Sequence, residues 1–352
     1  MINRIRKVLK YLSPAHKYEQ KPSIIKSKSK IGNEITEIFN SKKNNEIIYK
    51  NFGNLNPEKS FLIIQQTSLA GFFSNFNYVL NCLKLAESKN LIPIVDMENF
   101  PNLYNENQFI YNTNNSWLYY FDQVSDYSLE EIYKSKNVYF TSGVLQKNMK
   151  RDSGIKDNIV LIKNYIKINS RINDEIKSFQ DEFIKNKKVL GILFRGQNQR
   201  FAARHALPPS IKQMFNRTSK LLDKNSFDKI FLCTDEQLYL DKFKEKFGDM
   251  VVCYDSLRSY NENRMLRYTR NLHRYNLGKE VLIEMKILSE CSMLLGTKTN
   301  VTENAKLFSL LYNKDMEVNY IDNGRNYANP FLRRWNWHVR SLLPTFLGGF
   351  KL

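Results

Sequence analysis

An arginine that directly follows a short apolar run is the first candidate for ligand chemistry. Residues Val189–Phe194 are apolar, which predicts a buried strand, and Arg195 and Gly196 follow it at once. A guanidinium can hold a diphosphate through two parallel hydrogen bonds without losing its charge, and a glycine lets the backbone approach a ligand closely. His205 lies further along the same loop. For this segment alone, an ion pair between Arg195 and a structural carboxylate is the stronger alternative.

Two other predicted strands are also followed by polar residues. Thr234 and Asp235 come after Lys229–Cys233, where either side chain could cap the next helix or Asp235 could face the sugar or base of a nucleotide. The predicted strand Met293–Leu295 is followed by Thr297, Thr299 and Asn300. Hydroxyls and N–H groups at the start of a helix suit a phosphate, although ordinary helix capping explains the same residue types.

The N-terminal half contains one glycine turn at a comparable position. Gly71, Phe72 and Asn75 lie between the predicted strand Phe61–Gln65 and a predicted helix. Any strand–helix–strand unit can have such a glycine turn, so this segment indicates little by itself.

Asp96 is the candidate for a general base, which would take a proton from an attacking hydroxyl group. It ends the predicted strand Leu91–Val95, and Glu98 and Glu106 follow it. The more common role for an aspartate at this position is to cap the loop before Asn99, and this alternative stays open.

Apolar runs alternate with segments of helical periodicity, which predicts an α/β protein with parallel sheets. Further strands are expected at Val138–Phe140, Ile159–Ile162 and Met250–Tyr254, and helices at Asn75–Ser88, Ser170–Ile184, Ser210–Leu222, Glu236–Phe247, Lys279–Glu290 and Val301–Tyr312. We expect two Rossmann-like domains that face a cleft. The expected divisions are a basic arm over residues 1–45, an N-terminal domain over 46–168, a C-terminal domain over 169–322 and a basic aromatic tail over 323–352.

Composition narrows the class of protein. The chain has 352 residues and a formal net charge of +19, which attracts polyanions. Its four cysteines show no C-x-x-C spacing and its four histidines are scattered, so reduced thiols are expected and no metal site is expected. The longest apolar run is far shorter than the roughly 20 residues that span a bilayer. No signal-peptide pattern is present, so we expect a cytoplasmic protein.

Three basic segments leave their partners open. In the N-terminal arm, Ile2, Ile5, Leu9 and Leu12 recur at helical spacing among basic residues, which is typical either of a helix on an anionic membrane or of a solvated arm. The tail 330–350 mixes aromatic residues with arginines, which suits a membrane interface or packing onto the N-terminal domain. The third segment holds Arg258, Arg264, Arg267, Arg270 and Arg274 with Tyr260, Tyr268 and Tyr275. It could contact a diphosphate or an anionic acceptor, or form a solvated loop.

Taken in order, these segments resemble the superfamily of protein O-fucosyltransferases, core α-1,6-fucosyltransferases and nodulation fucosyltransferases, and more closely its bacterial members. The similarity covers roughly residues 61–320. It is carried by Gly71–Asn75, Ile92–Met97, Leu190–Asn198, Phe231–Glu236, Tyr254–Ser259 and Glu280–Met285, the last leading to Gly296–Asn300.

The resemblance implies a GT-B fold in which the C-terminal half holds a nucleotide-sugar and the N-terminal half binds the acceptor. It also implies an inverting transfer without a metal, usually from GDP-fucose. Arg195 would bind the donor diphosphate and stabilise the charge on the departing nucleotide. The rest of the implied donor site consists of Gly71, Phe72, Asn75, Gly196, Asn198, His205, Thr234, Asp235, Arg258, Thr297, Thr299 and Asn300.

The chain departs from the family pattern His-x-Arg-Gly-Thr-Asp at two positions. Leu193 stands in place of the histidine and Asn198 in place of the aspartate, so a different donor or reduced activity stays open. The expected acceptor is a cell-surface glycan or glycolipid, such as lipopolysaccharide made at the inner face of the plasma membrane. The alternatives are an inactive relative that acts as a binding protein and a basic nucleic-acid-binding protein, although the sequence shows no recognisable nucleic-acid-binding motif.

Overall fold

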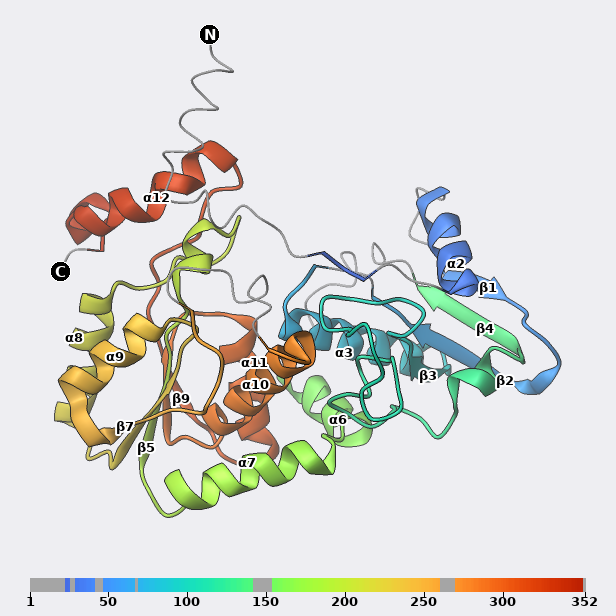
Figure 1. Ribbon diagram of the computed structural model, residues 1–352, viewed down its shortest axis with the longest axis horizontal. Helices are drawn as coiled ribbons and strands as arrows, with labels where there is room; N and C mark the ends of the chain where they lie inside the picture. Colours follow the sequence, from blue (N-terminus) through green and yellow to red (C-terminus); the bar gives the residue numbers. More distant parts are fainter. Residues whose placement is uncertain are drawn as a thin grey trace, which may run out of the picture. The chain divides into compact units, whose positions relative to one another are not determined.

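The computed structural model describes residues 23–25, 29–41, 47–66, 69–141, 154–259 and 270–350 (Figure 1). The chain divides into two compact units, each described here by itself. Unit 1 takes in Glu175–Thr269 and Leu282–Leu352, and unit 2 takes in Ser23–Asp174 and Arg270–Val281. A short segment that the sequence placed in the C-terminal half, Arg270–Val281, therefore belongs with the N-terminal one.

Unit 1 is built on a fully parallel sheet in the order β7-β6-β5-β8-β9. Its strands are β5 (Val189–Leu193), β6 (Lys229–Cys233), β7 (Val251–Val252), β8 (Met293–Gly296) and β9 (Glu317–Tyr320). Helices connect them in the order α8 (Ile211–Lys224), α9 (Gln237–Phe247), α10 (His273–Leu288) and α11 (Asn300–Leu311). This strand order is that of a doubly wound nucleotide-binding sheet, and the predicted parallel α/β architecture is confirmed.

The two faces of this sheet are covered by different helices. Leu190 and Ile192 of β5 point into a core with Met214 of α8 and Phe243 of α9. Gly191, between them, faces the other way, where a β-carbon would lie 3.0 Å from the sulfur of Cys291 and from a methyl group of Leu288. Helix α10 therefore packs onto the sheet at the place where β5 has no side chain.

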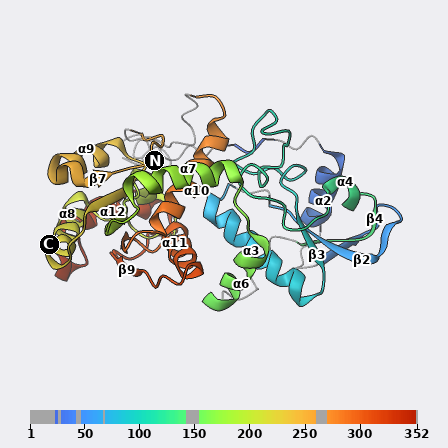
Figure 2. The same cartoon turned by 90° about the horizontal axis from the view of Figure 1, so that it is seen from below.

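Unit 2 has a smaller mixed sheet in the order β1-β4-β2-β3. Its strands are β1 (Ile47–Lys50), β2 (Leu55–Ile64), β3 (Ile92–Val95) and β4 (Ser135–Thr141), of which only β1 is antiparallel to its neighbour. Its helices are α2 (Lys30–Ser41), α3 (Phe72–Ser88), α4 (Leu129–Ile132) and α6 (Ile155–Tyr165). Helices α3 and α6 lie side by side and are joined by an ion pair between Lys84 and Asp157, 2.8 Å apart (Figure 2).

Several sequence-based expectations need correction. Ile159–Ile162 is not a strand, because it lies inside α6, where Ile155, Ile159 and Ile162 recur at helical spacing. Strand β7 is only Val251–Val252, shorter than expected, and β9 was not foreseen because two of its four residues are exposed. The tail contains a helix, α12 (Pro330–Leu342), which begins with a proline after the capping residue Asn329.

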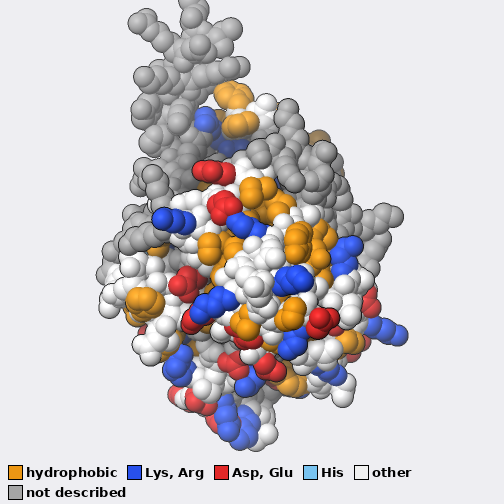
Figure 3. All heavy atoms as spheres, turned by 90° about the vertical axis from the view of Figure 1, so that its right-hand side faces the viewer, with side chains coloured by type: hydrophobic (Ala, Val, Ile, Leu, Met, Phe, Trp, Pro, Cys, Tyr) orange, Lys and Arg blue, Asp and Glu red, His pale blue; other side chains and the backbone are white. Residues whose placement is uncertain are grey.

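One face of the molecule carries charges of both signs despite the net positive charge of the chain. Figure 3 shows the side of the molecule on which β2 and β4 lie in Figure 1, and its described residues show basic, acidic and hydrophobic side chains interspersed. This face therefore does not offer the single-sign surface that a polyanion would select.

Gly278 of α10 is required by the aromatic packing of unit 2. A β-carbon at this position would overlap the hydroxyl group and ring of Tyr120 and lie 3.1 Å from Cδ1 of Tyr104. The Tyr120 hydroxyl donates a 3.0 Å hydrogen bond to the carbonyl of Tyr275, and the two rings are stacked.

We expect Gly278→Ala to lower the free energy of unfolding by about 1–3 kcal/mol, because Tyr120 must leave its position and give up this hydrogen bond. Urea unfolding measures the effect. Gly154→Ala is the matched control, since nothing lies within 4 Å of its β-carbon position, and its cost should stay below about 1 kcal/mol. Equal costs for the two substitutions would contradict this account of the packing.

Candidate functional site

The topology of unit 1 selects one edge of its sheet for ligand binding. The chain runs from β5 outward to β6 and β7, and α10 then returns it to β8 on the other side of β5. Doubly wound sheets bind ligands beyond the carboxyl ends of the strands where this reversal occurs. The loop after β5 carries Arg195 and Gly196, and the loop after β8 carries Thr297–Asn300. The structure therefore brings these two predicted segments to the same edge.

Arg195 lies at this edge with its side chain partly exposed. Its side chain is 25% exposed, and its Nε lies 3.8 Å from Oδ2 of Asp235, whose side chain is only 5% exposed. This distance is longer than a hydrogen bond, so the contact is an ion pair across a gap. The expected partnership with a structural carboxylate exists, but it leaves the guanidinium partly open to solvent.

Gly196 is a glycine because the end of β6 comes very close to it. A β-carbon there would overlap the side chain of Glu236 and lie 2.7 Å from Oδ1 of Asp235. The backbone N–H of Gly196 donates to that same Oδ1. The side chains of Asp235 and Glu236 thus occupy the space beside its α-carbon, and the expected approach of a ligand to Gly196 stays a prediction.

Thr234 and Asp235 have structural partners. The Thr234 hydroxyl accepts a hydrogen bond from the N–H of Glu236, directly before α9, and it is 1% exposed. The carboxylate of Asp235 binds Gly196 and Arg195, while its carbonyl accepts from the N–H of Ser259. Asp235 thus positions the loop after β5, and its carboxylate is directed at that loop.

The loop after β8 forms a complete helix cap. The Thr299 hydroxyl accepts from the N–H of Thr302, and the Thr302 hydroxyl accepts from the N–H of Thr299. Thr302 also contacts the carbonyl of Thr297 at 2.9 Å. The capping interpretation is therefore confirmed for Thr299, and Thr302 is an essential member that the sequence interpretation missed. Asn300 is the first residue of α11 and is exposed.

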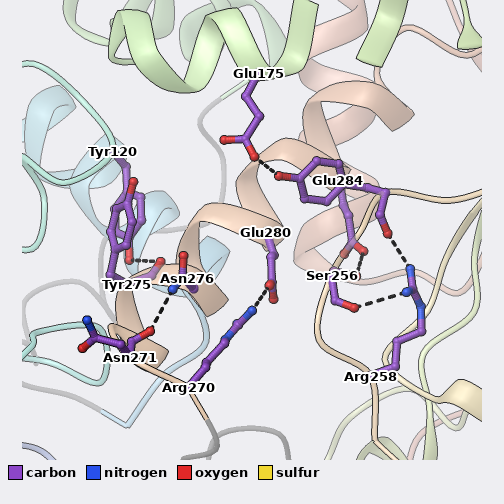
Figure 4. Close-up of polar contacts among 11 residues, drawn as sticks. Tyr120, Glu175, Ser256, Arg258, Arg270, Asn271, Tyr275, Asn276, Glu280 and Glu284 are labelled. Carbon is purple, nitrogen blue, oxygen red and sulfur yellow. Dashed lines mark hydrogen bonds and ion pairs between the residues drawn. The ribbon is translucent and has the colours of Figure 1, made fainter. Parts of the chain in front are cut away.

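Arg258 lies in the loop after β7 and is anchored within that loop. Its Nη2 donates to the carbonyl of Tyr254 at 2.6 Å and its Nη1 donates to the carbonyl of Ser256 at 3.2 Å. The Ser256 hydroxyl in turn donates to the buried carboxylate of Glu284 at 2.6 Å (Figure 4). The other oxygen of Glu284 accepts from the thiol of Cys233 at the end of β6. Glu284, which the sequence did not single out as a site residue, therefore ties two strand-end loops together.

His205 is coupled electrostatically to Arg195. Partial burial and the positive charge of Arg195 both lower the pKa of His205 below its usual value. A neutral imidazole is therefore expected near Arg195 at neutral pH.

Of the two residues that depart from the family motif, the structure describes the side chain of Leu193 but not that of Asn198. Leu193 is fully buried at the end of β5, where it contacts the position of Gly296. The side chain of Asn198 lies outside the described part of the structure.

The glycine turn of the N-terminal half lies in unit 2. Gly71 is the residue before α3, and nothing lies within 4 Å of a β-carbon built on it. Phe72 is buried against the rings of Tyr104 and Tyr120, and Asn75 accepts a hydrogen bond from Gln66. Of these three expected donor residues, Phe72 and Asn75 therefore have packing and hydrogen-bonding roles in unit 2.

Asp96 does not have the environment of a general base. It is fully buried, and burial raises its pKa. One carboxylate oxygen accepts from the N–H groups of Glu98 and Asn99, and the other accepts from the Asn99 amide and from the Tyr133 hydroxyl at 2.6 Å. The expectation that Asp96 contacts an acceptor is corrected, because the geometry is that of a loop cap before Asn99.

Two other carboxylates follow Asp96. Glu98 is exposed, and its pKa is raised by partial burial and by the neighbouring Asp96. Glu106 accepts a 3.0 Å hydrogen bond from the N–H of Tyr275 in the first turn of α10. Glu98 is thus the most exposed of the three carboxylates, since Glu106 is half-buried and Asp96 is buried.

The described part of the third basic segment is structural. Arg270 forms an ion pair with the buried Glu280 (Figure 4), and Arg274 is buried and donates to the carbonyls of Leu103 and Ser23. Tyr275 is buried as well. These residues do not form a solvated loop. Arg264, Arg267, Tyr260 and Tyr268 lie outside the described residues, as does most of the N-terminal arm.

No three His, Cys, Asp or Glu side chains within the described ranges are grouped so that they could hold a metal ion. No helix in the same ranges is long and apolar enough to cross a bilayer.

Solved structures of fucosyltransferases share this fold. The NodZ α-1,6-fucosyltransferase co-crystallised with GDP superposes with a TM-score of 0.52 at 15% identity, covering 76% of this chain and 96% of that one. NodZ from Bradyrhizobium gives 0.47 at 15% identity over 70% and 93%, and POFUT1 in complex with GDP-fucose gives 0.42 at 8% identity over 75% and 98%. No family model and no curated protein matches the chain. The first of these likenesses shows that the fold is that of NodZ.

The coupling between Arg195 and His205 can be tested by NMR titration of the four histidines. We expect Arg195→Gln to raise the pKa of His205 without fully restoring the ordinary value, because partial burial, the larger cause, persists. Arg200→Gln is the matched control: Arg200 lowers the pKa of His338, so this variant should shift His338 and leave His205 unchanged. A His205 pKa that does not respond to Arg195→Gln would place Arg195 elsewhere.

Proposed function

We propose that this chain is a glycosyltransferase that uses a nucleoside-diphosphate sugar, with GDP-fucose as the first candidate donor. The observation that carries the proposal is the position of Arg195, a partly exposed guanidinium at the reversal point of a doubly wound sheet. The fold shared with NodZ co-crystallised with GDP supports the same conclusion.

The chemistry of transfer requires a stable leaving group. When the bond between the sugar's anomeric carbon and the diphosphate breaks, negative charge grows on the departing nucleotide. A guanidinium supplies a positive charge that does not titrate and two parallel donors that match phosphate oxygens. The carboxylate of Asp235 lies 3.8 Å from Nε of Arg195, so we assign Asp235 as a positioning residue for Arg195.

The start of α11 is the second support for a diphosphate at this edge. This helix has 12 residues, so its N-terminus carries a partial positive charge, and the cap formed by Thr299 and Thr302 holds the preceding loop in place. Together with Arg195 this arrangement would stabilise the leaving group without a metal. We propose an inverting transfer to a hydroxyl group of a cell-surface glycan or glycolipid.

The general base of such a transfer has to reach solvent before the acceptor binds. Asp96 is fully buried and hydrogen-bonded, whereas Glu98 is exposed to solvent, and its raised pKa makes it a stronger base than an ordinary glutamate. Among the carboxylates that follow β3, Glu98 therefore suits the role best.

A nucleotide-binding protein without transferase activity is the second candidate function. Leu193 favours it, because a buried aliphatic side chain stands where the family pattern has a histidine. Both candidates require the nucleotide site, and only turnover separates them.

Nucleotide binding is tested by calorimetric titration with GDP, UDP and CMP. We expect selective binding of one nucleoside diphosphate, and we expect Arg195→Ala to weaken it by at least about tenfold, since a charge-assisted pair of hydrogen bonds is lost. Arg217→Ala removes the same charge from an exposed position on α8 of the same unit and should leave the affinity unchanged. Unchanged affinity in Arg195→Ala would refute the assigned role, and binding without release of nucleotide from any donor sugar would favour the second candidate.

The role of Asp96 as a loop cap can be tested separately by steady-state kinetics. With a donor and acceptor that give turnover, we expect Asp96→Asn to keep kcat within about tenfold of the wild type, because a loop cap does not take part in proton transfer. Loss of a true general base costs about a hundredfold or more. Glu98→Gln, the comparison variant, should show that larger loss with unchanged thermal stability. The reverse pattern, with kcat lost only in Asp96→Asn while its melting temperature is preserved, would restore Asp96 as the base.

A further inference from the structure

The C-terminal helix of unit 1 exposes its apolar side. Phe331, Trp335, Val339 and Leu342 recur at spacings of four, four and three along α12, so they share one face, and Phe346 follows in the short helix Thr345–Leu347. We call these five residues the apolar ridge. Leu342 is 75% exposed and Phe346 is 83% exposed. Exposed apolar side chains are common singly, but a continuous row of them marks an interaction surface.

The opposite side of α12 is fastened to unit 1 by specific contacts. Trp337 is buried with Leu207 and Phe350, and its Nε1 donates to the carbonyl of Pro208 at 2.7 Å. The guanidinium carbon of Arg200 lies 3.5 Å from the centre of the Trp337 ring. These contacts attach the tail to unit 1.

A buried amide pair completes the attachment. Asn336 Nδ2 donates to Oδ1 of Asn326 at 3.0 Å, and both side chains are buried. An ordinary surface helix buries its apolar face and exposes its polar face. In α12 a tryptophan and an asparagine face inward while the apolar ridge faces solvent, so the helix is held in place by contacts that do not use the ridge.

The segment that carries the ridge is basic in sequence, although Asp322, whose carboxylate accepts from the N–H of Gly324, directly precedes it. Residues 323–352 contain no Asp or Glu, and their cationic residues are Arg325, Arg333, Arg334, Arg340 and Lys351. Arginines that flank an exposed row of phenylalanine, tryptophan and leucine are the composition of helices that lie in the headgroup region of a bilayer. Tryptophan in particular favours that interface.

We propose that the apolar ridge docks unit 1 onto the surface of an anionic lipid bilayer. The ridge would enter the boundary between headgroups and acyl chains, and the flanking arginines would bind lipid phosphates. The proposal does not depend on the proposed transferase activity. If both hold, a docked protein would meet acceptors that are themselves linked to lipid.

Vesicle co-sedimentation tests the docking with the full chain. We expect the wild type to bind vesicles that contain phosphatidylglycerol and to bind pure phosphatidylcholine vesicles much more weakly, with binding reduced by salt. The double variant Leu342→Asp with Phe346→Asp should lose about tenfold or more of its partitioning, because two charges would have to enter the interface. The matched control is Phe109→Asp with Val160→Asp, two apolar residues of unit 2 that are 65% and 51% exposed, and it should bind like the wild type.

Tryptophan fluorescence gives a probe located on the ridge itself. The chain has three tryptophans, of which Trp117 and Trp337 are buried and Trp335 is 37% exposed. Binding to phosphatidylglycerol vesicles should shift the emission to shorter wavelength as Trp335 leaves water, and Trp335→Phe should abolish the shift while retaining binding.

Three results would overturn the docking proposal. The first is unchanged vesicle binding in the Leu342→Asp, Phe346→Asp variant, and the second is equal binding to neutral and anionic vesicles. The third is a dimer in solution that this variant converts to a monomer, which would make the ridge an interface between two copies of the chain. Arg195→Ala should bind vesicles normally, and the ridge variant should bind nucleotide normally, so failure of docking and failure of the nucleotide site can be told apart.

Discussion

The close approach of two strand ends in unit 1 is the constraint on which the candidate site depends. Gly196 meets Asp235 and Glu236 at a distance that admits no β-carbon, and its N–H binds the Asp235 carboxylate. Because that carboxylate also lies near Nε of Arg195, one buried group sets both the backbone path after β5 and the direction of the guanidinium. A larger residue at position 196 would have to displace the side chains of Asp235 and Glu236, and with them the carboxylate that lies near Arg195. The position of the site therefore depends on the packing at Gly196 and, in addition, on the ion pair between Arg195 and Asp235.

Much of the fold could be predicted because its signal is local. The buried strand β6 was predicted at its observed bounds, and α7 (Ser170–Phe183), α8, α9 and α11 differ by one or two residues, since continuous apolar runs and helical spacing appear directly in the sequence. The strand predicted at Ile159–Ile162 failed because β-branched residues at helical spacing were interpreted as a short apolar run. Strand β9 was missed because edge pairing leaves little apolar pattern. The pattern of apolar residues indicates which positions are buried, but it does not indicate which backbone groups form hydrogen bonds.

The sequence predicted which strand-end segments form the site, but it did not predict the partners of their side chains. Asp96 and Asp235 both end strands, and sequence alone cannot distinguish a carboxylate that faces a ligand from one that satisfies backbone N–H groups. In the structure both satisfy internal donors, as buried charges must. Thr302 and Glu284 were overlooked for the complementary reason, because their partners, Thr299, Ser256 and Cys233, become neighbours only after folding. For Arg195 as well, the sequence alone favours an ion pair with a structural carboxylate, and the structure shows such a pair with Asp235.

The direction in which each face of α12 points could not be predicted from the sequence. Periodicity shows that Phe331, Trp335, Val339 and Leu342 share a face, but it does not show whether that face points inward. Trp335 and Trp337 are two positions apart, so they point to different sides, and composition gives no reason to bury one instead of the other. The decision lies with partners distant in sequence: Pro208 accepts from the indole of Trp337, Arg200 covers its ring, and Asn326 pairs with Asn336. Once these contacts hold the polar side inward, the apolar side has to face outward, and its exposure follows from the attachment of the helix.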